Sequence, residues 1–363
     1  MLIVIAVLTI GYVAFLLWEK RMNEKALASF RHVIHVNGIR GKTSTCRLID
    51  AHLRGAGYRV FTKTTGSTPC WIDTNGVEHE ICRIGNANIG EQLSMIRKAY
   101  REKAEVLIIE CMAVQPELQQ VAQHQMVKGQ LNVITNVRYD HIFEMGESLE
   151  EIAESLTNTI PENGVLFTAD EEFAAFFREK AEPLHTEVIL CHCDGVGTKE
   201  NEAIAIAVGE RIGITPETFS QHISNYQEDF GAQKMYRTEE GRFLNLFSVN
   251  DPQSTQKVLQ RYFADTSDVV FLYNNRADRP DRLLLFLRYF FPNVKYGRII
   301  VMGEARNLAV RLLKKHGFAE VETAADWKTA VRLAGSGDIV GIGNIKGQAY
   351  EMIGYYEGGN EHE

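Results

Sequence analysis

The sequence predicts an α/β protein with two domains and an N-terminal transmembrane helix. Short apolar runs alternate with amphipathic stretches of helical spacing, which is typical of a parallel sheet with helices on both faces. The alternation is interrupted near residues 230–250 and then restarts, and 363 residues are enough for two domains. Residues 1–17 contain no charged side chain.

This apolar N-terminal run predicts a membrane anchor over residues 1–18. Its length is at the lower edge of the about 20 residues that span a bilayer. Trp18 and then the charged segment EKR follow the run, whereas a secretory signal carries its basic residues before the run. We therefore expect a single-pass protein of the cell membrane with cytoplasmic catalytic domains. A buried N-terminal helix is the alternative.

The first domain is predicted over residues 19–245. Strands are expected at residues 32–36, 58–62, 106–110, 131–136, 165–167 and 188–190, and helices at residues 44–57, 91–102 and 202–213. Residues 64–90 are rich in Gly, Thr, Ser and Asn, which predicts a long functional loop with a hairpin near residues 77–83.

The second domain is predicted over residues 246–363. Its strands are expected at residues 268–273, 298–302 and 338–341, and its helices at residues 281–291, 304–316 and 325–334. The same alternation of strand and helix indicates a smaller α/β domain.

The net charge of −8 provides no overall attraction for nucleic acid, so we expect no nucleic-acid partner. Local basic residues could still hold a polyanionic substrate. Those near the predicted loops are Arg40, Lys42, Lys63, Arg83, Arg138, Arg276 and Arg279.

The six cysteines show no disulfide framework. Cys191-His192-Cys193 contains two kinds of metal ligand, but a tetrahedral site needs a second cluster, and the sequence offers none. We expect these residues to pack at a strand end, with metal binding as the weaker alternative.

The strongest functional signal follows the first predicted strand. Gly38 and Gly41 allow backbone N–H groups to turn toward a phosphate, and the N-terminus of the next helix favours the same anion. Lys42 can reach the β- and γ-phosphates, and the Thr43 hydroxyl can ligate Mg²⁺. The residues expected to bind ATP here are Gly38, Ile39, Arg40, Gly41, Lys42, Thr43 and Ser44.

One position departs from the usual phosphate-loop pattern. The pattern G-x-x-x-x-G-K-[ST] has a glycine five residues before Gly41, and this chain has Val36 there. Only the shorter G-x-x-G-K-T matches. A basic turn is the alternative, but the strand before the loop and the helix after it favour phosphate binding.

Two further segments follow predicted strands. Glu110 ends the strand VLIIE, at the edge where open α/β sheets bind ligands, and its carboxylate suits Mg²⁺. A carboxylate that caps the next turn is the alternative. Asp140-His141 follows the strand LNVIT, and His141 could supply a metal ligand, although such a pair is often only a local hydrogen bond.

Together these segments resemble the Mur ligase family, which includes the folylpolyglutamate synthases. The segments VNGIRGKTSTCRLI, TKTTGSTP and ITNVRYDH, with the apolar N-terminus, are most similar to the poly-γ-glutamate synthases of that family. The resemblance covers residues 31–363. It implies a central P-loop ATPase domain with a parallel sheet and a smaller, Rossmann-like C-terminal domain.

The resemblance also implies roles for the residues around the loop. Gly38, Gly41, Lys42 and Thr43 would hold the triphosphate, and Thr43 and Glu110 would ligate one Mg²⁺ ion. Lys42 and Glu110 are therefore candidate catalytic residues.

Four residues outside the loop also receive roles from the resemblance. His141 would ligate a second Mg²⁺ ion, with Asp140 as its neighbour, and is the third candidate catalytic residue. Asn201 would lie near the nucleotide, and Asp251 would contact the ribose.

The chain departs from the family in three respects. It lacks the separate N-terminal domain that binds uridine-linked precursors. The family arginine before the C-terminal domain is not matched at residues 231–233, where Arg237 or Arg242 could substitute. The family's carbamylated lysine is not assigned.

The resemblance implies an ATP-dependent amide ligase that polymerises glutamate through γ-amide bonds by way of an acyl phosphate. ATP and one or two Mg²⁺ ions would be its cofactors. Its partners would be glutamate, the poly-γ-glutamate chain, small membrane subunits and a second copy of the chain.

Three other functions stay open. A folylpolyglutamate-synthase-like ligase would share the active site, but the anchor argues against it. A membrane-tethered P-loop ATPase that drives transport would need an Asp at a strand end, where the chain has Glu110 with His141. A non-catalytic nucleotide-binding adaptor is the third.

Overall fold

The computed structural model describes residues 1–66, 68–83, 85, 87–193, 198–226, 231–238 and 241–358. The chain divides into two compact units. The first contains residues 1–137 and 153–227, and the second contains residues 138–152 and 228–363.

The first unit is built on an eight-stranded sheet in the order β4-β3-β2-β5-β1-β6-β7-β8. Its strands are β1 (His32–Asn37), β2 (Val60–Thr64), β3 (Cys70–Ile72), β4 (Glu78–Glu80), β5 (Val106–Glu110), β6 (Leu131–Ile134), β7 (Val165–Thr168) and β8 (Glu187–Leu190). The strands from β2 to β8 in the sheet order run parallel, and β3 and β4 form an antiparallel extension next to β2. The carboxyl ends of the parallel strands therefore meet at one edge.

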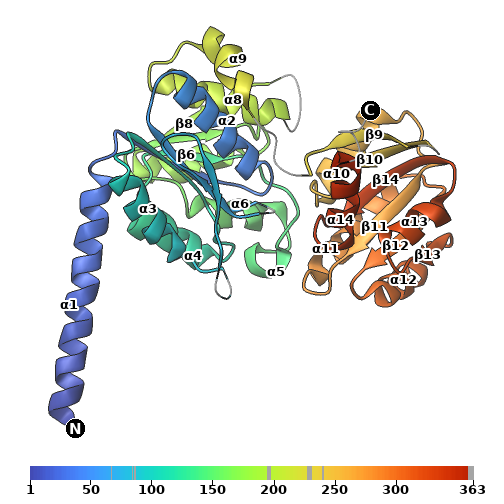
Figure 1. Ribbon diagram of the computed structural model, residues 1–363, viewed down its shortest axis with the longest axis horizontal. Helices are drawn as coiled ribbons and strands as arrows, with labels where there is room; N and C mark the ends of the chain where they lie inside the picture. Colours follow the sequence, from blue (N-terminus) through green and yellow to red (C-terminus); the bar gives the residue numbers. More distant parts are fainter. Residues whose placement is uncertain are drawn as a thin grey trace. The chain divides into compact units, whose positions relative to one another are not determined.

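Helices cover both faces of this sheet (Figure 1). They are α1 (Leu2–Leu27), α2 (Lys42–Gly55), α3 (Glu91–Arg101), α4 (Pro116–Val121) with the π-helical turn η1 (Ala122–Val127), α6 (Leu149–Thr157), α7 (Ala174–Ala181), α8 (Thr198–Arg211) and α9 (Phe219–His222). Successive side chains of β1 point to opposite faces of the sheet and so belong to two different hydrophobic cores. Ile34 and Val36 pack toward α2 and α8, whereas Val33 packs toward α1 and α3.

Helix α1 is a single unbroken element that leaves the first unit in Figure 1. Among the described residues it is the helix long and apolar enough to cross a membrane, with a mean hydropathy of 2.3 over its most apolar window, none of it buried. Its other end belongs to the core, because Asn23, Ala26 and Leu27 are buried. The structure therefore has the apolar helix that the sequence predicts.

The second unit is built on a six-stranded sheet in the order β13-β12-β11-β14-β10-β9. Its strands are β9 (Lys234–Thr238), β10 (Gly241–Asn245), β11 (Val270–Asn275), β12 (Arg298–Gly303), β13 (Val321–Thr323) and β14 (Gly337–Gly343). All are parallel except the edge strand β9. Its helices are α5 (Ile142–Met145), α10 (Pro252–Tyr262), α11 (Pro280–Leu285), α12 (Arg306–Lys315), α13 (Trp327–Ala334) and α14 (Gln348–Gly358).

The predicted α/β fold is confirmed, and the boundary between the units differs from residues 245 and 246. Strands β9 and β10 pair with each other, and β10 pairs with β14, so both belong to the second sheet. The sequence reasoning also missed α4, α6, α7, α10, α14, β3 and β13. Most of these are short, so their apolar spacing gives little signal.

Candidate active site

The loop between β1 and α2 depends on glycine at two positions. Gly38 has φ of 120°, and a Cβ there would lie 2.1 Å from the Thr135 hydroxyl oxygen at the end of β6. Gly41 has φ of 79°, and a Cβ there would lie 2.5 Å from the Asn201 Oδ1 atom. Larger side chains would therefore be both strained and obstructed.

Asn136 holds this loop from the neighbouring strand. The Ile39 N–H donates to the Asn136 backbone carbonyl at 3.1 Å, and the Arg40 N–H donates to its Oδ1 at 3.0 Å. The Asn136 Nδ2 donates back to the Arg40 carbonyl at 3.1 Å. Ile39 and Arg40 therefore use their N–H groups within the protein, and the first turn of α2 supplies the donors for an anion. Ser44 lies in that turn.

Lys42 and Thr43 begin α2 beside the end of β5. The Lys42 ammonium donates to the Gly38 carbonyl at 2.6 Å, so the side chain folds back over the loop. The Thr43 hydroxyl donates to Glu110 Oε2 at 2.9 Å, and the Thr65 N–H donates to the same oxygen at 2.6 Å. Glu110 is 2% exposed. A hydroxyl and a carboxylate side by side form the oxygen donor set that Mg²⁺ prefers.

Asn201 joins the loop from α8. Its Oδ1 accepts a hydrogen bond from the buried Thr45 hydroxyl at 3.0 Å, and its side chain lies against Gly41. The structure thus brings Asn201 to the loop from 156 residues further along the chain. The expected place of Asn201 near the nucleotide stays a prediction.

A buried ionic cluster lies next to this site. Lys63 is at the end of β2, next to β5 in the sheet, and is fully buried. Its ammonium lies 3.0 Å from Glu91 Oε1, and Arg83 Nε lies 2.7 Å from Glu91 Oε2. Burial lowers the pKa of Lys63, while Glu91 and Glu110 oppose that change. The sequence reasoning named Lys63 and Arg83 but missed their shared partner, Glu91.

Asp140 and His141 belong to the second unit. His141 has φ of 53° and precedes α5, and its N–H donates to Asp140 Oδ1 at 3.0 Å. Asp140 is buried between two guanidinium groups, with Arg279 at 2.5 Å and Arg282 at 3.2 Å. Asp140 therefore has an ionic role inside the second unit that the sequence reasoning missed.

Asp251 is the N-cap of α10 in the second unit. Its carboxylate accepts from the Ser254 N–H at 2.8 Å, and the residue is fully buried. Helix capping explains why an aspartate is present there. The expected contact with ribose stays a prediction.

Two further arginines of the second unit have local partners. Arg276 pairs with Asp278 at 2.5 Å, and Arg242 pairs with Asp338 at 2.6 Å. Arg237 is exposed on β9. These local pairs account for Arg276 and Arg242 without a substrate.

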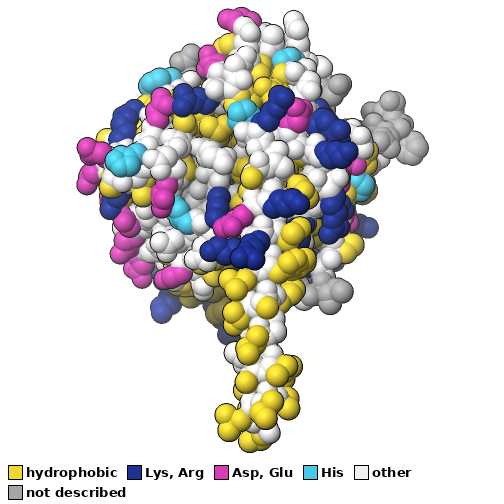
Figure 2. All heavy atoms as spheres, turned by 90° about the vertical axis from the view of Figure 1, so that its left-hand side faces the viewer, with side chains coloured by type: hydrophobic (Ala, Val, Ile, Leu, Met, Phe, Trp, Pro, Cys, Tyr) yellow, Lys and Arg dark blue, Asp and Glu magenta, His cyan; other side chains and the backbone are white. Residues whose placement is uncertain are grey.

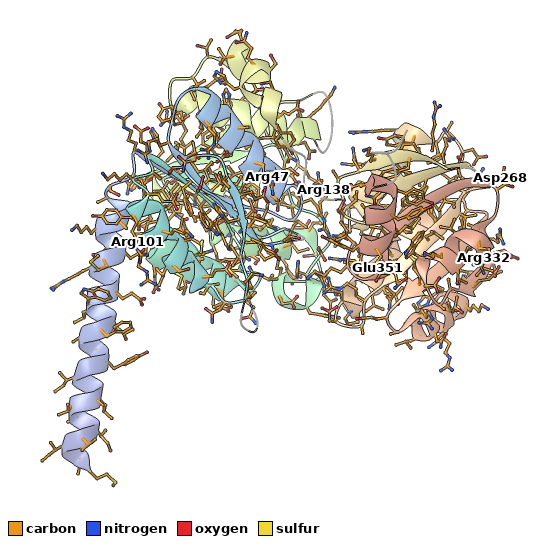
Figure 3. The ribbon with its side chains drawn as sticks, in the orientation of Figure 1. Arg47, Arg101, Arg138, Asp268, Arg332 and Glu351 are labelled. Atoms are coloured by element: carbon orange, nitrogen blue, oxygen red, sulfur yellow. The ribbon has the colours of Figure 1, made fainter. Side chains whose placement is uncertain are left out.

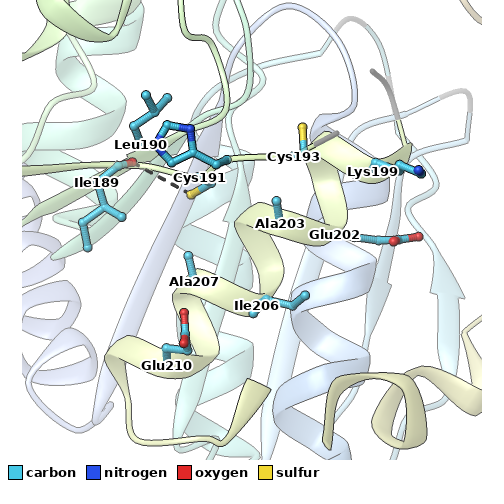
Figure 4. Close-up of a pocket in the computed structure, with 11 residues that line it drawn as sticks. Ile189, Leu190, Cys191, Cys193, Lys199, Glu202, Ala203, Ile206, Ala207 and Glu210 are labelled. Atoms are coloured by element: carbon cyan, nitrogen blue, oxygen red, sulfur yellow. Dashed lines mark hydrogen bonds between the residues drawn. The ribbon is translucent and has the colours of Figure 1, made fainter. Parts of the chain in front are cut away.

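The Cys-His-Cys segment lines a cavity of about 440 Å³ between β8 and α8 (Figure 4). Cys191 is buried, and burial raises the pKa of its thiol to about 12. Among the described residues no group of three His, Cys, Asp or Glu side chains is arranged to hold a metal ion.

Comparisons with known proteins cover nearly the whole chain. Residues 36–211 match the Mur ligase middle domain, and residues 232–359 match the poly-gamma-glutamate synthase CapB C-terminal domain. Capsule biosynthesis protein CapB of Bacillus anthracis is 32% identical over 382 residues, covering 97% of this chain and 82% of that protein. PGA synthase CapB of Bacillus subtilis (strain 168) is 31% identical over 92% of each chain.

Solved structures show the same fold at low identity. Folylpolyglutamate synthase from Thermotoga maritima has a TM-score of 0.61 and 14% identity, covering 97% of this chain and 98% of that one. A bifunctional folylpolyglutamate synthase/dihydrofolate synthase from Yersinia pestis, complexed with AMPPNP and Mn ion, has a TM-score of 0.70 and 15% identity over 92% of each chain. The resemblance drawn from the sequence motifs is confirmed. The chain therefore belongs to the CapB family of poly-gamma-glutamate synthases, built on the Mur ligase middle domain, and is an ATP-dependent amide-bond-forming ligase.

Proposed function

We propose that this ligase joins glutamate residues through γ-amide bonds to make poly-γ-glutamate. The observation that carries the proposal is the match of the CapB C-terminal domain to residues 232–359, in a chain whose first unit contains the phosphate loop described above. The two curated relatives are a capsule biosynthesis protein and a PGA synthase. A glutamate polymer is a product that fits the names of both relatives.

We assign the roles in ATP binding from the contacts around the loop. The first turn of α2 and the Lys42 ammonium bind the β- and γ-phosphates, and Asn201 supports the loop from α8. Thr43 and Glu110 would hold Mg²⁺, which neutralises phosphate charge when bound. His141 as ligand of a second ion and Asp251 as ribose contact complete the proposal.

The proposed reaction activates a carboxylate and then transfers it to an amine. A γ-carboxylate oxygen attacks the γ-phosphorus of ATP, and ADP leaves. The amino nitrogen of a second glutamate attacks the acyl carbon, phosphate leaves with the oxygen that it gained, and the amide nitrogen loses a proton. The Lys42 ammonium offsets the negative charge of the transferring phosphoryl group.

We further propose that α1 anchors the enzyme in the cell membrane, with the catalytic units in the cytoplasm. Its apolar turns are exposed, and the charged residues follow them. Glutamate and the growing chain are the proposed substrates. Small membrane subunits that hold or export the polymer, and a second copy of this chain, are the proposed protein partners.

The test is glutamate-dependent release of ADP together with detection of the amide product. Lys42→Ala should reduce both by at least about a hundredfold, because it removes a charge aimed at the transferring phosphoryl group. Lys314→Ala, an exposed change on α12, is the matched control and should leave both unchanged.

The same assay separates the alternatives. ADP release without any amide product would indicate an ATPase that drives transport. Amide formation only on a folate acceptor would indicate a folylpolyglutamate-synthase-like ligase. Polymer formation by the Lys42→Ala protein would contradict the proposed mechanism.

A further inference from the structure

The end of α1 is fixed to the first unit by polar contacts as well as by packing. Arg97 of α3 lies 3.0 Å from Glu19, and Lys128, which follows η1, lies 3.4 Å from Glu24. The Asn23 amide donates to the Met126 carbonyl at 2.8 Å. Because α1 enters the core without a break, no loop separates the apolar turns from the catalytic unit.

These contacts place α3 at the level of the membrane surface, if α1 spans the bilayer as proposed above. Residues 1–17 give about 26 Å of helix, close to the about 30 Å of a hydrocarbon core. Trp18 then lies at the interface, and Glu19 with its partner Arg97 lies in the headgroup layer. Lys128 pairs five residues further along α1, which is about 8 Å deeper in the cytoplasm.

Basic side chains from three separate segments gather at this level. We define the basic collar as Lys20, Arg21 and Lys25 of α1, Arg97 and Arg101 of α3, and Lys128. Figure 3 shows Arg101 beside the end of α1, and Figure 2 shows Lys and Arg side chains gathered where the apolar helix meets the body. Glu19 and Glu24 each offset one of these cations, so the collar keeps a positive charge.

We propose that the basic collar binds anionic phospholipid headgroups and holds the α3 face of the first unit flat against the membrane. This inference rests on the proposed membrane anchor. Three features support it together: the headgroup depth of Arg97, the charge of the collar, and the rigid continuation of α1 into the core. Each Lys or Arg near an anionic surface strengthens binding by about fivefold, so the charge that remains after Glu19 and Glu24 offset two of the cations still makes a substantial contribution.

The test uses the full chain in phosphatidylcholine vesicles with or without phosphatidylglycerol. A membrane-impermeant amine reagent labels exposed lysines, and mass spectrometry measures each one. Labelling of Lys25 and Lys128 should fall several-fold when phosphatidylglycerol is present and recover at high salt, because salt screens the attraction. Lys314 of α12 should be labelled equally in both vesicles.

A charge-reversal variant tests the collar directly. Arg101→Glu should weaken the phosphatidylglycerol-dependent protection of Lys128 by about fivefold or more, because it replaces an attraction with a repulsion. Arg311→Glu, an exposed change on α12, is the matched control and should keep the protection. Thermal unfolding and ADP release in detergent should be unchanged in both variants, because Arg101 lies outside the nucleotide loop.

Each outcome decides one proposal. Equal labelling of Lys128 in the two kinds of vesicle, in a protein that floats with them after carbonate washing, would overturn the collar and leave the anchor standing. Protection of Lys25 alone would also overturn it, since the α3 face would then stand off the surface. A protein that does not float at all would overturn the anchor itself.

Discussion

At the residue scale, the nucleotide loop depends on what Gly41 lacks. Its positive φ and its contact with Asn201 leave no room for a side chain. Position 41 is therefore constrained by two independent causes, its backbone conformation and the close approach of Asn201. A substitution there tests the geometry of the site without removing any charge.

Gly41→Ala should weaken ATP binding by more than tenfold and lower the free energy of unfolding by about 1–3 kcal/mol. The reason is backbone strain combined with displacement of Asn201. Gly57→Ala is the matched control, because Gly57 has φ of 93° but no atom within 4 Å of the added Cβ. Nucleotide titration and urea unfolding measure both effects. Equal ATP affinity in the two variants would show that Asn201 does not press on the loop.

His35 links stability to pH. It lies fully buried in β1, its Nδ1 lies 2.8 Å from the side-chain Oε1 of Gln123, and burial lowers its pKa to about 4. The unfolded chain takes up this proton first, near the ordinary pKa of 6.5. The contribution of neutral His35 to the free energy of unfolding is therefore fully present above pH 6.5, and it is lost as the pH falls from 6.5 toward 4.

Between about pH 7 and about pH 5, the wild-type protein should lose about 2 kcal/mol more unfolding free energy than the His35→Asn variant. Denaturant unfolding at each pH measures this difference, which does not depend on the absolute stability of the variant. Identical pH slopes would mean that His35 is accessible to protons in the folded protein.

Sequence reasoning found the residues that are contiguous and missed their distant supports. Gly38 to Thr43 form a short local pattern, so their contacts follow from the fold around one strand end. Asn136 reaches the loop across 96 residues and Glu91 reaches Lys63 across 28, and no local pattern encodes either pairing. An amide and a carboxylate of this kind look like ordinary loop and helix-end residues in the sequence.

At the scale of elements, the cluster of Lys63, Glu91 and Arg83 joins three parts of the first unit. It connects the end of β2, the segment after β4 and the first turn of α3. Burial alone would raise the pKa of Glu91, but Arg83 and Lys63 lower it, so the carboxylate stays charged. The long loop predicted at residues 64–90 is thereby tied to the sheet beside Glu110.

The two ends of this cluster should respond differently to neutralisation. Glu91→Gln should cost about 3–5 kcal/mol of unfolding free energy, because it leaves the buried Lys63 without its counter-charge. Lys63→Met should cost much less, since Arg83 still pairs with Glu91. Glu154→Gln, which breaks an ion pair between a 35% exposed Lys180 and a 55% exposed carboxylate, is the control and should cost about 0–1 kcal/mol. Equal losses for Glu91→Gln and Glu154→Gln would contradict the account.

The segment around Asp140 illustrates a limit on assigning elements to domains from sequence order. Residues 138–152 lie between strands of the first sheet in the sequence but belong to the second unit. Asp140 pairs with Arg279 and Arg282, which follow β11. These ionic contacts span about 140 residues, and sequence periodicity carries no information about them.

At the scale of the whole molecule, α1 consists of two parts with different surroundings. Residues 1–18 pack against nothing in the described structure, whereas Ala26, Leu27 and Phe30 are buried beside Ile96 and Ala99. The boundary between the exposed apolar turns and the core therefore lies inside one continuous helix, which the hydropathy pattern alone does not show.

Two truncations should separate these parts. A chain that lacks residues 1–18 should unfold with unchanged free energy but move from the membrane fraction to the soluble fraction. A chain that begins at Arg31 should lose about 3–6 kcal/mol, because it uncovers the apolar surface that Leu27 and Phe30 bury. Urea unfolding of both chains measures the difference. If the chain that lacks residues 1–18 were less stable than the full chain, the apolar turns would have to pack on the protein.

The hydrogen bonds from Asn136 to the nucleotide loop have a consequence for folding during synthesis. The nucleotide loop takes its shape from an amide that lies 96 residues further along the chain. During synthesis, every residue of the phosphate motif has left the ribosome once β1 and α2 have emerged. The loop does not yet have its folded shape at that point, because Asn136 is still missing. ATP can therefore stabilise the nascent chain only after β6 has left the exit tunnel and joined the sheet, and nucleotide binding reports that the centre of the sheet is complete.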